Sequence, residues 1–246
     1  MSGHSKWATI KHKKGAADAK RGQMFTKLIK EISIAARMGG GDPEGNPRLR
    51  TAVIKARGAN MPKDNIDRAI KKGTGELEGV NYEELSYEAR LGEAAILIEV
   101  LTDNRNRAAA DVRNILTRAG AELAKAGSVS RLLTRKGVIT LDGEKYTEDA
   151  VMEAALEGGA EDVAAADGVV EVTTAPEDFE AVVDALTTKN FETLSAEISM
   201  VPEAPVTLDV ATTGKVLKLI DKLEENDDVQ NVYSNIDVPE GFEDEE

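Results

Sequence analysis

The sequence lacks cysteine and has only two histidines, His4 and His12. Without cysteine, disulfides, thiolate nucleophiles and cysteine metal ligands are all excluded. The two histidines have no carboxylate companions at ligand spacing, so neither a metal nor any other cofactor is expected. The motifs G-x-S-x-G and H-E-x-x-H are absent, and so is a G-x-G-x-x-G after a strand. The sequence therefore predicts a protein that is not an enzyme.

Long apolar runs are also missing. No stretch of about 18 apolar residues occurs, which excludes a membrane-spanning helix. The start, MSGHSKWATIKHKKG, is basic but has no apolar core, so it does not resemble a secretory signal, and it leaves no room for an organellar presequence. We therefore expect a cytoplasmic protein.

Charge is abundant but unevenly distributed, and the net charge of −14 conceals this. Residues 1–75 hold 17 Lys and Arg against 6 Asp and Glu, a net +11. Residues 76–136 hold 9 against 10, and residues 137–246 hold 5 against 29, a net −24. Such asymmetry within one chain indicates that the basic part binds a polyanion.

The basic part has the pattern of three short helices. Their apolar stripes are Phe25–Ala36, Leu49–Ala56 and Ile66–Ile70. Gly39–Gly41 would end the first helix, and Asn46 followed by Pro47 is typical of the start of the second. Pro62 would open the third helix and Gly73 would end it. We expect a small bundle steadied by the rest of the chain.

The remainder alternates strands and helices. LSYEARLG and EAAILIEVLTD are predicted strands, followed by a helix that ends at Gly120. A β-α-β-β-α-β order, typical of a ferredoxin-like domain, follows in Gly137–Leu141, Thr147–Leu156, Asp162–Ala165, Val169–Thr174, Pro176–Thr188 and Thr193–Met200. After Pro205 we expect a strand over VTLDV, a helix over Thr213–Leu223 and a strand over VQNVYSNI.

This order predicts an α+β multidomain fold. A hairpin with one helix rarely folds alone, so the end of the chain is expected to complete the incomplete layer before the ferredoxin-like block. The predicted parts are a basic three-helix domain (1–78), a discontinuous α+β domain (79–134 plus 205–238), an inserted ferredoxin-like domain (135–204) and an acidic tail (239–246).

The basic residues form the strongest functional signal. Lysine and arginine neutralise phosphates and release counterions, so we predict a salt-dependent nucleic-acid interface. The predicted contacts are Lys6, Trp7, Lys11, His12, Lys13, Lys14, Lys20, Arg21, Lys27, Arg48, Arg50, Lys55, Lys63, Arg68, Lys71, Lys72, Arg105 and Arg107. Trp7 could stack on a base or pack against the bundle. Two alternatives to this interface are a solvated cationic face and a face docked on the chain's own acidic domain.

The last two of these residues belong to the segment TDNRNR, Thr102–Arg107, at a predicted strand-to-helix turn. Asp and Asn at such a turn cap the helix and leave the arginines exposed, where they could bind a phosphate backbone. Two other segments are not predicted to be functional sites. Thr213–Val216 lacks the residues of a phosphate loop and is expected to begin a helix, and Glu224/Glu225 with Asp227/Asp228 are expected in a solvated helix-end loop.

Residues 3–75, beginning GHSKWATIKHKKG, resemble the N-terminal signature of the YebC family, whose relatives include the mitochondrial translational activator of cytochrome oxidase. TDNRNR and the Gly127–Val129 segment GSV match later landmarks, so the resemblance covers essentially the whole chain. It implies a helical N-terminal domain and two α+β domains, one inserted in the other. It also implies that the basic N-terminal residues and the Asp103–Arg107 turn contact nucleic acid.

Two functions fit this resemblance, because members are described as DNA-binding transcriptional regulators or as factors that associate with ribosomes and aid difficult translation. We expect a DNA-binding transcriptional regulator; the alternative is a translation factor on rRNA or tRNA that relieves stalled ribosomes. The absence of a helix rich in base-reading side chains favours backbone binding. The acidic domain could repel nucleic acid, bind a basic protein such as a ribosomal protein, or contact the basic domain. The oligomeric state is left open.

Overall fold

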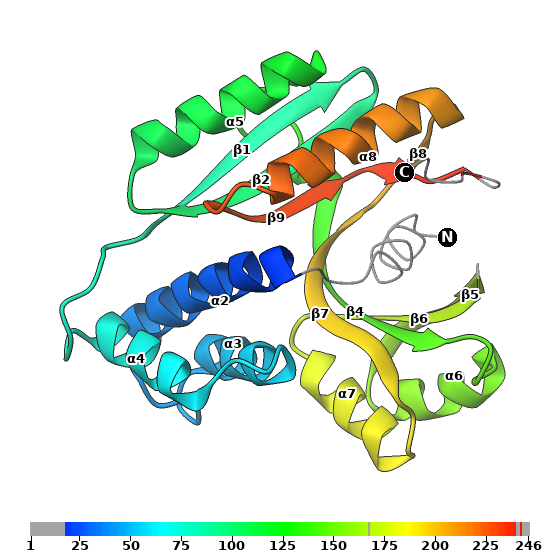
Figure 1. Ribbon diagram of the computed structural model, residues 1–246. Coiled ribbons are helices and arrows are strands. Elements are labelled where there is room, and N and C mark those ends of the chain that lie inside the picture. Colours follow the sequence, from blue (N-terminus) through cyan, green and yellow to red (C-terminus); the bar gives the residue numbers. More distant parts are fainter. Residues whose placement is uncertain (1–17, 167, 240–241, 243–246) are drawn as a thin grey trace.

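The computed structural model describes residues 18–166, 168–239 and 242, with only the backbone for residues 18–20. These residues form seven α-helices, ten strands and one 3-10 helix, Ser130–Leu132 (Figure 1). The predicted mixture of helices and strands is confirmed. No helix among the described residues is long and apolar enough to cross a membrane.

Three helices form the N-terminal unit. They are α2 (Asp18–Gly39), α3 (Pro47–Gly58) and α4 (Lys63–Thr74). Their apolar stripes meet in one core, in which Ile32, Leu49 and Ala56 are fully buried. Asn46 begins α3 as predicted, since its side chain accepts a hydrogen bond from the Leu49 N–H. The prediction of three short helices is wrong for α2, which has 22 residues.

Gly73 lies inside α4, so the prediction that it ends this helix is wrong. Gly75 ends α4 in a left-handed conformation with φ 84°, which suits glycine. A Cβ atom on Gly73 would lie 2.3 Å from the Ser33 carbonyl oxygen and 2.8 Å from the Ala36 Cβ, both on α2. Gly73 therefore permits the close approach of α2 and α4.

Replacing Gly73 with alanine is expected to destabilise the protein by about 1–3 kcal/mol, because the backbone of α2 must move to admit the methyl group. Gly22→Ala is the matched control in α2, since a Cβ there meets nothing within 4 Å. That variant should be slightly stabilised, because alanine favours a helix over glycine. Urea unfolding of both variants checks this, and equal stabilities would contradict the close-packing role.

The central sheet has the strand order β3-β1-β2-β9 and is antiparallel. Its strands are β1 (Glu83–Leu91), β2 (Ala94–Thr102), β3 (Glu122–Leu123) and β9 (Val229–Ser234). Helices α5 (Arg105–Ala119) and α8 (Val210–Glu224) cover one face of this sheet. Alternate residues of β2, Ile96, Ile98 and Val100, pack against these helices. The C-terminal part of the chain thus completes this layer through α8 and β9.

A second antiparallel sheet has the order β5-β6-β4-β7. It comprises β4 (Leu133–Asp142), β5 (Ala160–Ala166), β6 (Val169–Thr174) and β7 (Thr193–Pro202), with helices α6 (Glu148–Glu157) and α7 (Phe179–Thr188). Along the chain these elements follow β-α-β-β-α-β, and their core includes Ile139, Leu141 and Leu186. The predicted start of α7 at Pro176 is three residues early, since a turn precedes Phe179.

The segment after Pro205 differs most from its prediction. Strand β8 spans only Val206–Thr207 and pairs in parallel with β10 (Ile236–Asp237). The Asp209 side chain accepts the Thr212 N–H and begins α8, so the expected strand VTLDV is cut short. Thr213–Val216 consequently lies within α8 and does not begin it. Most of the predicted acidic tail lies outside the described residues.

Candidate nucleic-acid interface

The structure places only part of the predicted interface. Lys6, Trp7, Lys11, His12, Lys13 and Lys14 lie outside the described residues, and the side chain of Lys20 is not described. The remaining predicted residues lie on α2, α3, α4 and the first turn of α5. Arg21 is exposed near the start of α2.

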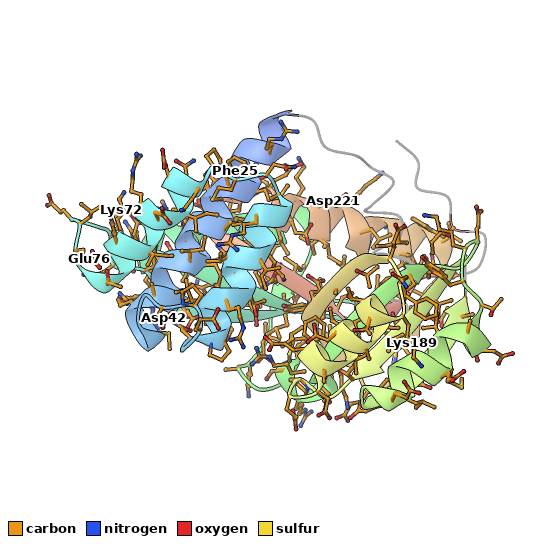
Figure 2. All side chains as sticks on the ribbon, turned by 90° about the horizontal axis from the view of Figure 1, so that it is seen from below. Phe25, Asp42, Lys72, Glu76, Lys189 and Asp221 are labelled. Carbon is orange, nitrogen blue, oxygen red and sulfur yellow. The ribbon has the colours of Figure 1, made fainter. Side chains whose placement is uncertain are left out.

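Helix α4 presents an open cationic surface, here called the α4 face: Lys63, Arg68, Lys71 and Lys72. All four side chains are exposed, and none forms an ion pair or hydrogen bond with another described residue. Their backbone is fixed because Ile66 and Ala69, on the opposite side of α4, are buried against α2 and α3. In Figure 2, Lys72 lies at the outer edge of the molecule, on the side away from Lys189.

The α4 face also carries two acids. Asp64 and Asp67 are exposed, four residues before Arg68 and Lys71. This spacing weakens the positive potential but produces no ion pair within 4.0 Å in the described structure. The α4 face therefore keeps a net charge of +2 from these six side chains, and its cations are available to a phosphate group.

The three predicted contact residues of α3 are instead engaged by acids of the same chain. Arg48 pairs with Glu31 of α2 at 2.7 Å and with Glu84 of β1, and these carboxylates raise the pKa of Arg48 although burial opposes them. Arg50 pairs with Glu180 at 3.1 Å, and Lys55 pairs with Glu197 at 3.4 Å. Arg48, Arg50 and Lys55 are therefore held in ion pairs, and their contact with nucleic acid stays a prediction.

The ion pairs of Arg50 and Lys55 join α3 to the second sheet with its helices α6 and α7, here called the β4–β7 unit. Glu180 lies on α7 and Glu197 on β7, so the acidic segment does contact the basic domain, one of the three roles considered for it. The side chain of Glu180 is 58% exposed and that of Glu197 is 50% exposed. Exposed pairs of this kind contribute about 0–1 kcal/mol and weaken with salt, so a phosphate can compete for these two cations.

Lys27 is used for a structural contact. Its Nζ donates a hydrogen bond of 2.7 Å to the Glu224 carbonyl oxygen, and the side chain is half-buried. Glu224 is the last residue of α8, and its carbonyl oxygen also accepts a hydrogen bond from Gln23 Nε2 at 3.2 Å. A cation at this position is favoured by the negative end of the helix dipole. Lys27 therefore joins α2 to α8, and its predicted contact with nucleic acid stays a prediction.

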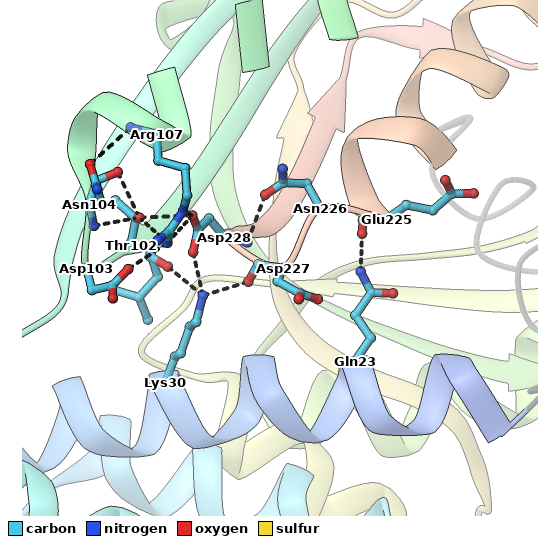
Figure 3. Close-up of polar contacts among 11 residues, drawn as sticks. Gln23, Lys30, Thr102, Asp103, Asn104, Arg107, Glu225, Asn226, Asp227 and Asp228 are labelled. Carbon is cyan, nitrogen blue, oxygen red and sulfur yellow. Dashed lines mark hydrogen bonds and ion pairs between the residues drawn. The ribbon is translucent and has the colours of Figure 1, made fainter. Parts of the chain in front are cut away.

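The segment Thr102–Arg107 runs from the end of β2 into the first turn of α5, and Asn104 caps the helix as predicted by accepting the Arg107 N–H at 3.1 Å (Figure 3). Arg105 is exposed and has no partner among the described residues. Arg107 is held by Asp103 at 2.6 Å and by Asp228 at 2.8 Å, while its side chain stays 46% exposed. Arg105 is therefore accessible to a ligand, whereas only the exposed part of the Arg107 side chain is accessible.

Asp228 is the centre of this network, and its expected place in a solvated loop is wrong. It is only 4% exposed and accepts hydrogen bonds from Lys30 at 2.6 Å and from Thr102 Oγ1 at 3.0 Å, besides Arg107 (Figure 3). Lys30 is itself only 7% exposed and also donates to the Asp227 carbonyl oxygen at 2.8 Å. This network joins α2 to the β2–α5 and α8–β9 turns.

Asp228 and Arg107 each stabilise the charged form of the other. Burial alone would raise the pKa of the Asp228 carboxyl, but hydrogen bonds from Lys30 and Arg107 outweigh burial and hold that pKa below its usual range. The hydrogen bonds from Arg107 to Asp228 and Asp103 raise the pKa of the guanidinium in turn. Asp228 and Arg107 therefore stay ionised near neutral pH, so the network fixes the start of α5, which carries Arg105.

Comparison with known proteins identifies the chain. Residues 5–76 match the model of the TACO1/YebC protein N-terminal domain, and residues 82–236 match that of the TACO1/YebC second and third domain. The chain belongs to the TACO1/YebC family. Two relatives are named "Probable transcriptional regulatory protein". That of Treponema denticola is 68% identical, covering 99% of both chains, and that of Geotalea uraniireducens is 56% identical, covering 98% of this chain and 97% of its own.

A solved structure in the comparison supports the same fold. The crystal structure of a conserved hypothetical protein from Aquifex aeolicus is 45% identical to this TACO1/YebC chain, with a TM-score of 0.81. The match covers 91% of this chain and 93% of the Aquifex chain. Within the described part of the present chain, no group of three or more His, Cys, Asp or Glu residues is placed to hold a metal ion.

The segment GSV, which resembles a TACO1/YebC landmark, is organised by the buried carboxylate of Glu88. Glu88 is 6% exposed and accepts hydrogen bonds from the backbone N–H groups of Gly127 at 2.7 Å and Val129 at 2.6 Å. Val129 is fully buried with Leu133 against the far face of the central sheet. Burial alone would raise the pKa of Glu88, but these N–H groups, that of Val129 foremost, lower it below its usual value.

This lowered pKa predicts a stability that falls in acid. An unfolded glutamate has a pKa of about 4.3, and the folded value is lower, so Glu88 stabilises the fold above the unfolded pKa. That stability is lost as the pH falls through the folded pKa. Glu88→Gln should be less stable at pH 7, and its free energy of unfolding should fall less steeply below about pH 5. Urea unfolding across this range checks it, and parallel curves would contradict it.

Proposed function

We propose that this chain is a nucleic-acid-binding regulator of gene expression that acts foremost on DNA, as a transcriptional regulator in the cytoplasm. The α4 face carries the proposal, because it combines fixed backbone positions with four exposed cations that have no partner among the described residues. The names of the relatives support a role in regulation and in transcription. We take the basic helices as the binding domain, followed by a discontinuous α+β domain (79–134 plus 205–238) and an inserted ferredoxin-like domain (135–204).

The proposed mechanism is neutralisation of the sugar-phosphate backbone. Lys63, Arg68, Lys71 and Lys72 bind phosphates and release counterions, which gives affinity without base specificity. Arg50 and Lys55 then exchange Glu180 and Glu197 for phosphate as the nucleic acid approaches α3. Arg105 and the predicted residues outside the described part extend the contact. No chemical step is required of any side chain.

A translation factor that binds rRNA or tRNA and relieves stalled ribosomes is the second candidate function. One observation favours it: the exposed side chains of α4 from Lys63 to Lys72 are only lysine, arginine and aspartate, and Asn65 is half-buried. Exposed Asn and Gln, the side chains that read adenine, are absent from this face. A face that contacts only phosphates suits folded RNA as well as DNA.

Crosslinking in living cells, followed by sequencing of the bound nucleic acid, tests the two functions. We expect discrete peaks at promoters, recovered with the wild-type chain and reduced when Lys71 and Lys72 are both replaced by glutamate. Reads concentrated on rRNA and tRNA would contradict the transcriptional function and support the ribosomal one. If neither DNA nor RNA is enriched over a mock purification, the nucleic-acid-binding proposal is wrong.

A further inference from the structure

The acidic C-terminal segment places its few cations in a specific way. Residues 137–246 contain only five lysines, and two of them, Lys145 and Lys189, pair with Glu192 at 3.3 Å and Glu157 at 2.8 Å. The other three lie on α8: Lys215, Lys218 and Lys222. They are three and four residues apart and all exposed, so they form one stripe along the outer side of the helix.

Most of these α8 lysines form no ion pair with a described acid. Lys215 and Lys218 have no ion pair or hydrogen bond with another described residue. Lys222 pairs only with the exposed Glu225, at 2.7 Å, within its own helix end. The opposite side of α8 is apolar, with Val216, Ile220 and Leu223 buried, which fixes the direction of the stripe.

Helix α5 carries three arginines: Arg113 and Arg118 lie on its outer half, whereas Arg105 lies at the helical angle of buried residues such as Val112. Arg105, Arg113 and Arg118 are exposed, and none has a partner among the described residues. The one acid within α5 is Asp111, which is half-buried. Between the arginines, the exposed side includes Asn106, Asn114 and Thr117, which are neutral hydrogen-bonding groups suited to phosphate or sugar oxygens.

The two helices form a single layer. Val112 and Leu116 of α5 and Val216 and Ile220 of α8 belong to one core on the same face of the central sheet, so both outer sides face solvent in the same general direction. Figure 1 shows α5 and α8 on one side of this sheet, whereas α3 and α4 lie beyond α2 at the other end of the molecule. The cations of this layer are therefore separate from the α4 face.

We propose that the outer side of this layer, here called the α5/α8 face (Arg113, Arg118, Lys215, Lys218 and Lys222), is a second contact surface for the sugar-phosphate backbone. This rests on the proposed function, that the chain binds nucleic acid. A polyanion is the proposed partner because this face is cationic, whereas the chain as a whole, with its net charge of −14, repels polyanions. The alternative occupant, the acidic segment of a second copy, is an outcome of the test below.

Two separate cationic surfaces change how the chain binds. A nucleic acid that reaches both faces would make two linked contacts with the chain. Linked contacts of this kind raise the overall affinity beyond that of either face alone. Because the faces share no side chains, their free-energy contributions should be additive.

The test measures binding of the full-length chain to a labelled 40-base-pair duplex DNA and to a folded RNA of similar length, at several salt concentrations. The variant Arg113→Glu with Lys218→Glu changes the α5/α8 face. Lys145→Glu with Lys189→Glu is the control, because it changes the net charge equally on the β4–β7 unit. We expect the α5/α8 variant to lose about tenfold or more in affinity at low salt, with a salt slope smaller by about 1.8 for DNA.

Each outcome decides between the possibilities. Equal affinity losses in the α5/α8 variant and the control would overturn the second surface, since only net charge would then matter. If Lys71→Glu with Lys72→Glu weakens binding while the α5/α8 variant does not, the proposed function stands and this inference fails. If the α5/α8 variant abolishes self-association in sedimentation without changing nucleic-acid affinity, the occupant is a second copy and the inference is wrong. Circular dichroism melting confirms that each variant is folded.

Discussion

Asp228→Ala is expected to lower the free energy of unfolding by about 3–5 kcal/mol, because it leaves the buried Lys30 ammonium without its anion. Lys30 is 7% exposed, and its other hydrogen bonds go only to the carbonyl oxygens of Leu101 and Asp227. Arg107 would also lose one of its two carboxylate partners.

Urea unfolding at pH 7 measures this effect, with Lys222→Ala as the control. Lys222 pairs with Glu225 on the surface, so its removal should change stability by no more than about 0.5 kcal/mol. Adding Lys30→Met to Asp228→Ala should restore part of the loss, because the unpaired buried charge is then removed. A loss below about 1 kcal/mol for Asp228→Ala would show that the network does not hold α2 on the central sheet.

Reversing charge on the α4 face is expected to weaken nucleic-acid binding by about a hundredfold at low salt, when Lys71 and Lys72 are both changed to glutamate. Each substitution removes one phosphate contact and adds a repelling carboxylate. Both side chains are exposed, so the free energy of unfolding should stay within about 0.5 kcal/mol of the wild type. Fluorescence anisotropy with the same labelled duplex measures the affinity.

Asp67→Asn is the matched control on the same helix. Removing an exposed anion from the α4 face should raise the affinity, so the two variants are expected to move in opposite directions. If both variants bind as the wild type does, phosphate contacts by α4 are excluded. If both lose affinity equally, the effect comes from the helix itself and not from its charge.

Local signals in the sequence predicted most elements of the fold. The start of α3 follows from Asn46 and Pro47, which are typical of a helix N-terminus, and the strand β6 has the predicted bounds Val169–Thr174. These features depend on side chains only a few residues apart, so a pattern in the sequence suffices. The role of Gly73 could not be predicted in this way, because it depends on the Ser33 carbonyl of another helix.

The candidate site shows the same limit more strongly. Arg50 and Lys55 have the spacing of open basic residues, but their partners, Glu180 and Glu197, are 130 and 142 residues away. Asp228 is 198 residues from Lys30, and nothing in the run Asp227–Asp228 distinguishes the buried carboxylate from the exposed one. Which cations stay open is decided by tertiary packing, which residue spacing within one helix does not encode.

The lysines of the α5/α8 face could have been predicted from the sequence, but the net charge of a long segment conceals them. Counting residues 137–246 as one acidic segment conceals that three of its five lysines share one side of α8. A helical projection of residues 210–224 would have separated this stripe from the acids of the loops. Charge is thus best counted for each face of an element, and not for a segment.

The salt dependence of affinity for duplex DNA, measured with the full-length chain between 50 and 200 mM salt, tests the central claim most directly. Cations that neutralise phosphates predict a straight line of log affinity against log salt, with a slope of about −0.9 for each phosphate contacted. The four cations of the α4 face alone predict a slope steeper than about −3. No binding at 50 mM salt, or an affinity that salt leaves unchanged, would contradict the claim that these open cations bind a sugar-phosphate backbone.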